Sequence, residues 1–352
     1  MGRRNLFGAQ LKHRILGLHA MPAPDSPIAL GIVTPVFNDW ASLAQLIREI
    51  DACADLSGRT VHIIAVNDGS NEPPDPAAFT GPFRRIERIR IVHLAVNLGH
   101  QRAIAVGLVE AHKDPDIASV IIMDSDGEDR PSDIERLLAA QAGDPQVIVV
   151  ASRAKRSETT LFRLFYLVYK AIFVLLTGQR ISFGNFCLLP AAALRSLVHN
   201  AAIWNNLAAA VSRARIPRRA VPTMRGARYA GQSRMNFASL VIHGLSAVSV
   251  YADIAMVRII VAAAALATAV ALSMLGVVAV RLFTDLAIPG WATTAIGLMS
   301  VIFVQVMLIA GVATFQLLNQ RSSRSILPIE EAQAYIERIE DIALVPAQAA
   351  AS

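Results

Sequence analysis

The sequence contains few cysteines and lacks the common glycine-rich nucleotide loops. Only two of its 352 residues are cysteine, Cys53 and Cys187. Two distant cysteines give neither a disulfide framework nor the spacing of a zinc site, which agrees with a reducing compartment. No Gly-x-Gly-x-x-Gly motif and no Walker loop occurs. Ordinary dinucleotide and P-loop sites therefore lose support.

Acidic residues are absent before Asp25, whereas Arg3, Arg4, Lys12 and Arg14 make this start basic. The stretch has no apolar core of about 7–15 residues, so we do not expect a secretory signal. Its spaced apolar residues suit a basic amphipathic helix that rests on anionic lipid. A disordered tail is the alternative. Residues 1–26 are treated as a basic N-terminal segment.

Charge is also absent from two long apolar runs, 259–280 and 292–318. The whole chain is 54% hydrophobic with a mean hydropathy of +0.46, high for a purely soluble protein. At ~1.5 Å per residue the shorter run reaches ~33 Å, enough to cross a bilayer. We expect a transmembrane hairpin over 257–320. A buried hairpin of a soluble protein is the alternative.

Basic residues flank this hairpin at its two ends. Arg258 precedes the first run, and Arg321 and Arg324 follow the second, while the link holds only Arg281. The positive-inside rule then places both ends in the cytoplasm. We expect an integral protein of a bacterial-type inner membrane, with both termini cytoplasmic and a tail over 321–352. Small residues along the spans would also permit a homo-oligomer.

Strand-like and helix-like segments alternate from about residue 27 to residue 152. The strands are expected at 29–33, 61–66, 89–94, 117–123 and 147–151. Such alternation predicts an α/β fold, a mostly parallel sheet with helices on both faces. Ligands of these sheets bind beyond the carboxyl ends of the strands. Polar residues follow four strands there, namely Asn38-Asp39, Asn67-Asp68, Asn97 and Asp124–Asp126.

The last of these clusters is the most acidic. Asp124, Asp126, Glu128 and Asp129 lie within six positions. Their repulsion would be relieved by a divalent cation. Hard oxygen ligands without nearby His or Cys favour Mg²⁺ or Mn²⁺ over zinc. The alternative is an acidic turn that caps the helix starting near Pro131. Convergence of the four strand ends favours the metal site.

Four motifs lie at these strand ends, namely Thr34–Asp39 (TPVFND), Val66–Ser70 (VNDGS), Asn97–Gly99 (NLG) and Asp124–Asp126 (DSD). Together they resemble family 2 inverting glycosyltransferases with a GT-A fold. The longer run DSDGEDRP resembles polyprenyl-phosphate glycosyltransferases of the dolichol-phosphate mannose synthase type. Arg228, Gly231, Ser233 and Arg234 extend the resemblance. It implies a cytoplasmic GT-A domain over 27–234, a juxtamembrane amphipathic helix over 235–256 and then the two spans.

The resemblance also implies roles for individual residues. The nucleotide-sugar would contact Pro35, Phe37, Asp39, Asn67, Asp68, Asn97, His100 and Asp124, with Asp68 accepting from the base. The metal would be held by Asp124, Asp126 and Glu128, and the catalytic set would be Asp126, Glu128 and Asp129. The acceptor phosphate would contact Arg153, Arg163 and Arg234. The implied reaction moves a sugar from a UDP- or GDP-linked donor to a polyprenyl phosphate, for envelope glycan modification. No nucleic-acid partner is expected.

The chain departs from the family pattern at several positions. Ser182-Phe183-Gly184-Asn185-Phe186-Cys187 stands where relatives usually read Asp-x-Gly-Asp-Phe-Arg. His100-Gln101 replaces a common lysine, and Asn67 replaces an aspartate. A general base would then be absent, or would be Glu128 or Asp129. Two alternatives follow: another lipid acceptor such as a glycerolipid, or a non-catalytic membrane scaffold. The intact Asp68, Asp124 and Asp126 speak against the scaffold.

One more apolar segment, 161–176, carries only Arg163 and Lys170 as charges. Seven positions apart, these cations share one face of a helix. The segment is too short and too charged to span a bilayer. We expect a helix lying against lipid headgroups, with a core helix as the alternative.

Overall fold

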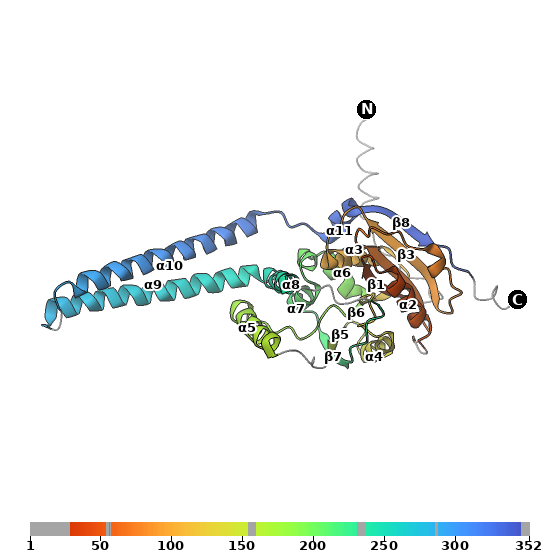
Figure 1. The fold of residues 1–352 in the computed structure, drawn as a ribbon, viewed down its shortest axis with the longest axis horizontal. Helices are drawn as coiled ribbons and strands as arrows, with labels where there is room; N and C mark the ends of the chain where they lie inside the picture. Colours follow the sequence, from red (N-terminus) through yellow and green to blue (C-terminus); the bar gives the residue numbers. More distant parts are fainter. Residues whose placement is uncertain are drawn as a thin grey trace, which may run out of the picture. The chain divides into compact units, whose positions relative to one another are not determined.

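The computed structural model describes residues 29–53, 56, 58–153, 160–230, 237–285 and 288–345. The chain divides into two compact units (Figure 1). The first unit combines 1–155, 182–234 and 327–352, and the second combines 156–181 and 235–326. The chain therefore enters the first unit three times, and the last entry follows the two long helices.

The first unit is built on a sheet with the strand order β7-β5-β6-β4-β1-β2-β3-β8 in the described part of the chain. Neighbouring strands are parallel except where β6 pairs with β4 and β5, and where β8 pairs with β3. The predicted, mostly parallel sheet is confirmed. The strands are β1 (Ala29–Val36), β2 (Thr60–Asn67), β3 (Ile86–Leu94), β4 (Ile117–Ile122), β5 (Ile148–Arg153), β6 (Cys187–Pro190), β7 (Arg218–Thr223) and β8 (Ile336–Ile342).

Helices cover both faces of this sheet, as predicted. Side chains alternate along a strand, so Val33 of β1 joins one core cluster and Ile32 joins the other. The first cluster includes residues of α3, α6 and α7, and the second includes residues of α2 and α4. These helices are α2 (Trp40–Asp51), α3 (His100–Lys113), α4 (Ile134–Gln141), α6 (Ala191–Val198) and α7 (Leu207–Arg213), with short 3₁₀ turns at Pro76–Phe79, Pro131–Asp133 and Ala201–Trp204.

Helix α3 lies unusually close to the sheet. A Cβ on Gly107 would come within 2.5 Å of Val33 Cγ1 and 2.9 Å of Val66 Cγ2. A residue with a side chain would push the helix outward, because a close-packed core has no spare volume there. This close approach fixes the distance between α3 and the strands β1 and β2 at Gly107.

Strand β8 completes the sheet edge after the long helices. It is preceded by α11 (Pro328–Glu331) and a 3₁₀ turn at Ala332–Tyr335. Arg90 on β3 donates two hydrogen bonds to Asp341 on β8, at 2.8 and 3.0 Å. The sequence pattern predicts no strand after residue 320. The isoleucines of IERIEDI recur every third position, which hides the two-residue period of a strand.

The second unit contains α5 (Thr160–Thr177), α8 (Phe237–Ser249), α9 (Ala252–Phe283) and α10 (Trp291–Ser322). Helices α9 and α10 form a hairpin in which Ala263 and Ala267 pack with Val306. Each has 32 residues and is apolar enough to cross a membrane. At ~1.5 Å per residue each is ~48 Å long, beyond the ~30 Å hydrocarbon core of a bilayer.

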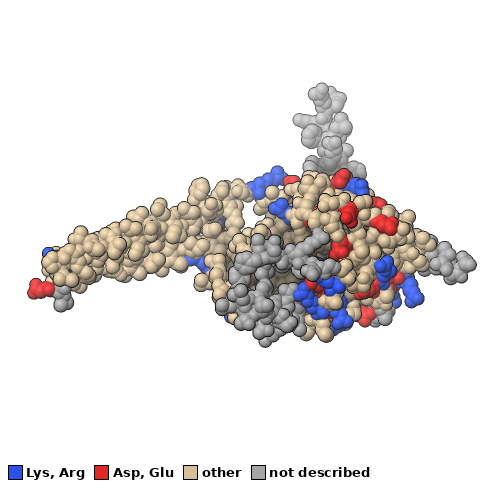
Figure 2. Space-filling model, in the orientation of Figure 1, with Lys and Arg blue, Asp and Glu red and all other residues tan. Residues whose placement is uncertain are grey.

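The apolar side chains of this hairpin face outward. Leu275 is 66% exposed and Phe315 is 69% exposed. Figure 2 shows few charged residues along the hairpin surface in view. A hairpin in a soluble core would bury such side chains, so the soluble alternative is not supported. Two apolar helices of this kind fit a membrane protein. The expected homo-oligomer stays a prediction.

Helix α5 belongs to the same unit as the hairpin. Arg258 of α9 donates hydrogen bonds to the carbonyl oxygens of Val174 and Leu175 at the end of α5. The ring of Phe173 meets Tyr251 edge to face. Leu175 is 72% exposed. The predicted helix over 161–176 is confirmed as a helix, and the described part of its surface is not that of a core helix.

Candidate active site

The carboxyl ends of four parallel strands lie on the same side of the sheet. Strands β4, β1, β2 and β3 are neighbours and run in the same direction. Their carboxyl ends must then lie side by side. The predicted polar clusters after these strands are therefore brought to one edge, as the alternating sequence pattern indicated.

The carboxylate of Asp68 joins the turn after β2 to the turn after β3. Its oxygens accept hydrogen bonds from the backbone N–H groups of Leu98, at 2.7 Å, and Gly99, at 3.0 Å. Asn97 Nδ2 donates to the Asp68 carbonyl oxygen at 2.9 Å. Burial raises the pKa of the Asp68 carboxyl, and the two N–H groups oppose that shift. Asp68, predicted to accept from the nucleobase, thus organises the turn where α3 begins.

A second set of hydrogen bonds joins the turns after β1 and β2. Ser70 N–H donates to Asn67 Oδ1, and Asn38 N–H donates to Ser70 Oγ, both at 2.9 Å. Asn71 N–H donates to Asn38 Oδ1 at 2.8 Å. Asn38 has a φ of 51°, a left-handed conformation that asparagine tolerates better than most residues. The two turns are therefore fixed to each other.

The other predicted nucleobase contacts differ in exposure. Pro35 is buried inside β1, whereas the ring of Phe37 is 41% exposed. Asp39 is the N-cap residue of α2, and its side chain makes no capping hydrogen bond. Phe37 is thus the member of this group that offers an accessible aromatic face.

In the acidic loop after β4, backbone N–H groups donate hydrogen bonds to carboxylates of the same loop. Asp124 N–H donates to Asp129 Oδ2 at 3.0 Å, and Glu128 N–H donates to Asp126 Oδ1 at 2.9 Å. Burial is the main cause that raises the pKa of Asp126, and the charge of Asp124 raises it further. The loop turns at Gly127, whose φ is 86°.

Asp124 differs from the other acids of this loop. Its Oδ1 atom is buried and has no hydrogen-bond partner among the described residues. His100 Nε2 lies 3.4 Å from that oxygen but does not form a hydrogen bond with it. An anionic oxygen that is removed from water without a partner is costly. Asp124 is therefore the carboxylate best placed to take up an added ligand.

A later segment, Arg225–Tyr229, lies against this loop. Arg228 Nη2 is 2.7 Å from Asp126 Oδ2, and Arg225 pairs with Glu128. Backbone N–H groups of Gly226 and Tyr229 donate to the carbonyl oxygens of Glu128 and Asp126, both at 2.9 Å. The sequence pattern assigns no role to Arg228 or Arg225. The sequence signal for this contact is the pair of arginines in MRGARY, because their positive charge is complementary to that of the acidic run about a hundred residues earlier.

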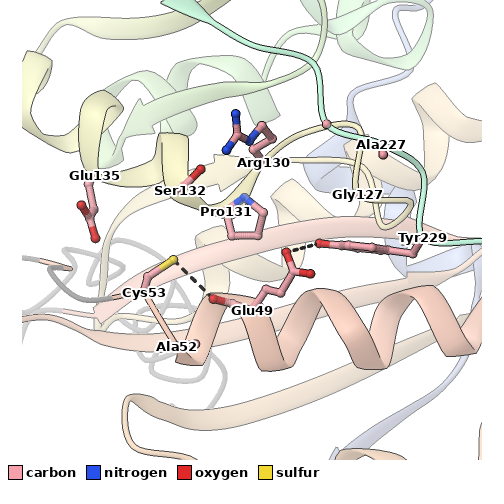
Figure 3. A pocket seen from close by; sticks show the side chains of 11 residues that line it. Glu49, Ala52, Cys53, Gly127, Arg130, Pro131, Ser132, Glu135, Ala227 and Tyr229 are labelled. Atoms are coloured by element: carbon pink, nitrogen blue, oxygen red, sulfur yellow. Dashed lines mark hydrogen bonds between the residues drawn. The ribbon is translucent and has the colours of Figure 1, made fainter.

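A pocket of about 520 Å³ adjoins the acidic loop (Figure 3). At one side of it, Tyr229 Oη donates to Glu49 Oε2 at 2.6 Å. Its lining comprises Glu49, Ala52, Cys53, Gly127, Arg130, Pro131, Ser132, Glu135, Gly226, Ala227 and Tyr229. None of the predicted site residues is among them. The pocket thus lies against the acidic loop, but the carboxylates of that loop do not line it.

Three residues that differ from the family pattern, His100, Gln101 and Asn185, contact one another. Gln101 Nε2 donates to Asn185 Oδ1 at 3.1 Å, and Asn185 Nδ2 lies 2.9 Å from His100 Nε2. Leu207 N–H donates to Gln101 Oε1 at 2.8 Å. Neutral polar groups therefore stand beside Asp124 where the pattern has charged ones. Cys187 is buried in β6, and burial raises the pKa of its thiol, so this residue is an inert part of the core.

The carboxylates fit a divalent cation that is shared with a ligand. No group of three or more His, Cys, Asp or Glu side chains in the described ranges could hold a metal by itself. Mg²⁺ commonly takes one or two carboxylates together with substrate phosphates, and needs no complete protein cage. Asp124, with its unpartnered buried oxygen, suits that arrangement, whereas Asp126 and Glu128 are paired with arginines.

The predicted acceptor-phosphate contacts lie where the structure gives no side chains. Arg153 ends β5 and Arg163 lies in α5, but their side chains fall outside the described residues. Arg234 is outside the described residues altogether. All three assignments stay predictions.

Comparison with known proteins gives a family match over the part of the chain that carries these motifs. Residues 31–194 match the model of the family described as glycosyl transferase family 2. An undecaprenyl-phosphate 4-deoxy-4-formamido-L-arabinose transferase of Pseudomonas aeruginosa (strain LESB58) is 33% identical over 136 residues. The one of Enterobacter sp. (strain 638) is 30% identical over 130 residues. The alignments span 38% of each relative, and 38% and 37% of this chain.

Solved structures with a related arrangement are more distant in sequence. One is glucosyl-3-phosphoglycerate synthase from Mycobacterium tuberculosis in complex with Mn²⁺, UDP and phosphoglyceric acid, at 14% identity and a TM-score of 0.47. That alignment covers 64% of this chain and 78% of the other. Residues 31–194 contain most of β1, all of β2 to β6 and the acidic loop, so the part of the chain that is similar to glycosyl transferase family 2 is the part that carries the four motifs.

Proposed function

We propose that this chain is a membrane-bound inverting glycosyltransferase that moves a sugar from a UDP- or GDP-linked donor to a polyprenyl phosphate. The observation that carries the proposal is the buried Asp124 oxygen, which accepts no hydrogen bond from any described residue, at the shared strand ends of a segment that matches family 2. The two exposed apolar helices support a lipid acceptor. The names of the aligned relatives specify undecaprenyl phosphate, and we extend that class of acceptor to this chain.

The donor nucleotide would lie over the turns after β1, β2 and β3. Phe37 offers an aromatic face on which a base can stack. Asp68 and Asn67 hold the turns in place through their hydrogen bonds to backbone N–H groups. Rigid turns lower the entropy cost of binding, because they are ordered before the ligand arrives.

The diphosphate of the donor would meet the acidic loop. Asp124 and Asp126 would hold Mg²⁺ or Mn²⁺, which stabilises the negative charge that develops on the leaving diphosphate. Arg228 and Arg225 offset the repulsion among the acids of the loop. Glu128, predicted as a third ligand, would have to exchange its partner Arg225 for the cation.

The acceptor would supply its own nucleophile. A phosphate oxygen is already anionic, so it requires arginine contacts more than a general base. Asp129 is 2% exposed and its carboxylate accepts from the Asp124 N–H, which suits a supporting position in the loop. Glu128 is then the more accessible of the two predicted bases. Arg153, Arg163 and Arg234 are the proposed phosphate contacts.

A different lipid acceptor, such as a glycerolipid, is the second candidate. It is favoured by the neutral contacts of His100, Gln101 and Asn185 at positions where the family pattern carries charge. A hydroxyl acceptor would need a base, because its oxygen carries a proton in the ground state. Its proton would have to go to Glu128 or Asp129.

The proposed function is tested by presenting membranes that contain the chain with a panel of radiolabelled UDP- and GDP-sugars. We expect label to enter the lipid extract with one donor and to depend on added polyprenyl phosphate. The linkage in the product should be labile to mild acid, as expected of a sugar phosphate. Label in a glycerolipid would support the second candidate, and no labelled lipid with any donor would contradict both.

The metal assignment predicts that Asp124→Asn and Asp126→Asn each lower kcat by at least about 100-fold, as loss of a preorganised electrostatic group does. A chelator should abolish transfer by the natural chain, and Mn²⁺ or Mg²⁺ should restore it. The matched control is Glu87→Gln, an exposed carboxylate on β3. Circular dichroism checks that the variants are folded. Full turnover in excess chelator would remove the cation from the proposal.

The acceptor assignment predicts that Arg234→Ala weakens use of the lipid phosphate by roughly 10- to 150-fold, the equivalent of about 1.5–3 kcal/mol for a charge-assisted contact. Donor binding should change little. Arg234→Lys should recover only part of the loss, since an ammonium cannot make a bidentate contact. Weaker membrane association with normal kinetics in detergent would instead identify Arg234 as a lipid anchor.

The proposed orientation predicts which side of the membrane each loop occupies. In a Cys53→Ala background, a membrane-impermeant maleimide should label Thr284→Cys in right-side-out vesicles. Ser323→Cys should be labelled only after the vesicles are opened. Cys187 is 1% exposed and gives little background. Labelling of Ser323→Cys in sealed vesicles would reverse the proposed topology.

A further inference from the structure

A chain of hydrogen bonds runs from the C-terminal strand into the turns at the strand ends. In the antiparallel register of β3 and β8, His93 lies opposite Arg338, and Glu340 follows two residues later on β8. Glu340 Oε2 is 3.3 Å from His93 Nε2, and His93 Nδ1 is 3.0 Å from Asn67 Nδ2. His93 and Asn67 are 4% and 7% exposed. Buried polar groups of this kind hold their partners closely, because an unsatisfied one is costly.

The direction of every bond in this chain is fixed. A backbone N–H can only donate, so the bond from Ser70 N–H assigns the oxygen of the Asn67 amide. Asn67 Nδ2 must then donate to His93 Nδ1. The ring proton of His93 is left on Nε2, which faces the Glu340 carboxylate. Burial and the charge of Arg338 lower the pKa of His93, which agrees with a neutral ring.

The other end of this chain reaches both turns that precede α2 and α3. Ser70 Oγ accepts from Asn38 N–H in the turn after β1. Asp68, next to Asn67, holds the N–H groups of Leu98 and Gly99 in the turn after β3. A shift of the Asn67 amide would thus move the backbone of all three turns that form the proposed nucleotide site.

β8 makes two other interactions, of which only the Arg90–Asp341 pair is separate from this chain of hydrogen bonds. Arg90 and Asp341 form a bidentate pair on the same two strands. Arg338 Nη2 lies 3.5 Å from His93 Nε2 and 3.9 Å from Glu340 Oε2, so the charge of Arg338 lies beside the His93–Glu340 hydrogen bond. Glu340 and Asp341 are neighbours on one strand, but only Glu340 connects to Asn67. They form a matched pair for testing.

We propose that Glu340 is a positioning residue for the nucleotide donor, and that the strand following the second apolar helix thereby tunes donor affinity. The inference rests on the proposed function, which assigns the three turns to the nucleotide. It goes beyond that function by giving the C-terminal segment a part in the donor site. A purely structural β8 would instead affect stability through either carboxylate and leave binding unchanged.

The test measures binding of UDP and of GDP, each with Mn²⁺, to the full chain in detergent by isothermal titration calorimetry. Glu340→Ala should weaken binding of the preferred nucleotide by about 3- to 10-fold, as expected for the loss of one hydrogen bond to a buried histidine. Glu340→Gln keeps an oxygen that accepts from His93 and should bind within about twofold of the natural chain. Asp341→Ala should bind normally, even if its melting temperature falls.

A double-mutant cycle tests whether the effect passes through Asn67. Glu340→Ala should add little to the loss caused by Asn67→Ala, since the two residues act in one chain of bonds. Additive losses, unchanged binding in Glu340→Ala, or an equal loss in Asp341→Ala would each overturn the inference. In those cases the proposed function stands, because the natural chain still binds nucleotide. If the natural chain binds neither UDP nor GDP, the donor assignment and this inference both fail.

Discussion

Four carboxylates within six positions of one loop can coexist only if their charges are compensated. Asp126 and Glu128 are compensated by Arg228 and Arg225. Asp129 accepts a backbone N–H from within the loop. The loop and the arginine segment, about a hundred residues apart in the chain, therefore form one structural unit. Asp124 keeps an oxygen with no hydrogen bond among the described residues, which leaves the loop prepared for an added charge.

A carboxylate with a purely structural role, Asp114, lies near the amino ends of the strands β2 and β3. Asp114, at the end of α3, is 7% exposed, and its Oδ2 atom is 3.0 Å from His62 Nδ1 and 2.8 Å from Arg88 Nη1. Its other oxygen accepts from the Asp116 N–H. Both oxygens of Asp114 accept hydrogen bonds or ion pairs, whereas Asp124 Oδ1 lies 3.4 Å from His100 Nε2 and accepts no hydrogen bond from the described part of the chain. The number of hydrogen-bond partners of its oxygens thus distinguishes a carboxylate that supports the fold, Asp114, from one that can bind an added cation, Asp124.

Much of this arrangement could be predicted from the sequence because it follows from local patterns. Apolar runs marked the parallel strands, and polar residues after each run marked the shared edge. The partners of the acidic loop could not be predicted in this way, since Arg225 and Arg228 meet it only through tertiary packing. The same holds for β8, where isoleucines at Ile336, Ile339 and Ile342 suggest no strand period. The departures at His100 and Asn185 were visible, but their mutual contact was not.

The position of β8 in the chain has a consequence for biosynthesis. Arg90 and Asp341 are separated by 251 positions, and both apolar helices lie between them. At roughly 5–20 residues per second, the ribosome needs about 12 to 50 s to make that interval. During this time the outer edge of β3 has no β8 to pair with, and an open strand edge is prone to associate with other chains. Both helices of the hairpin are therefore synthesised before the strand that pairs with β3. A nascent chain that stalls in the second helix would display an incomplete sheet to the quality-control machinery of the cell.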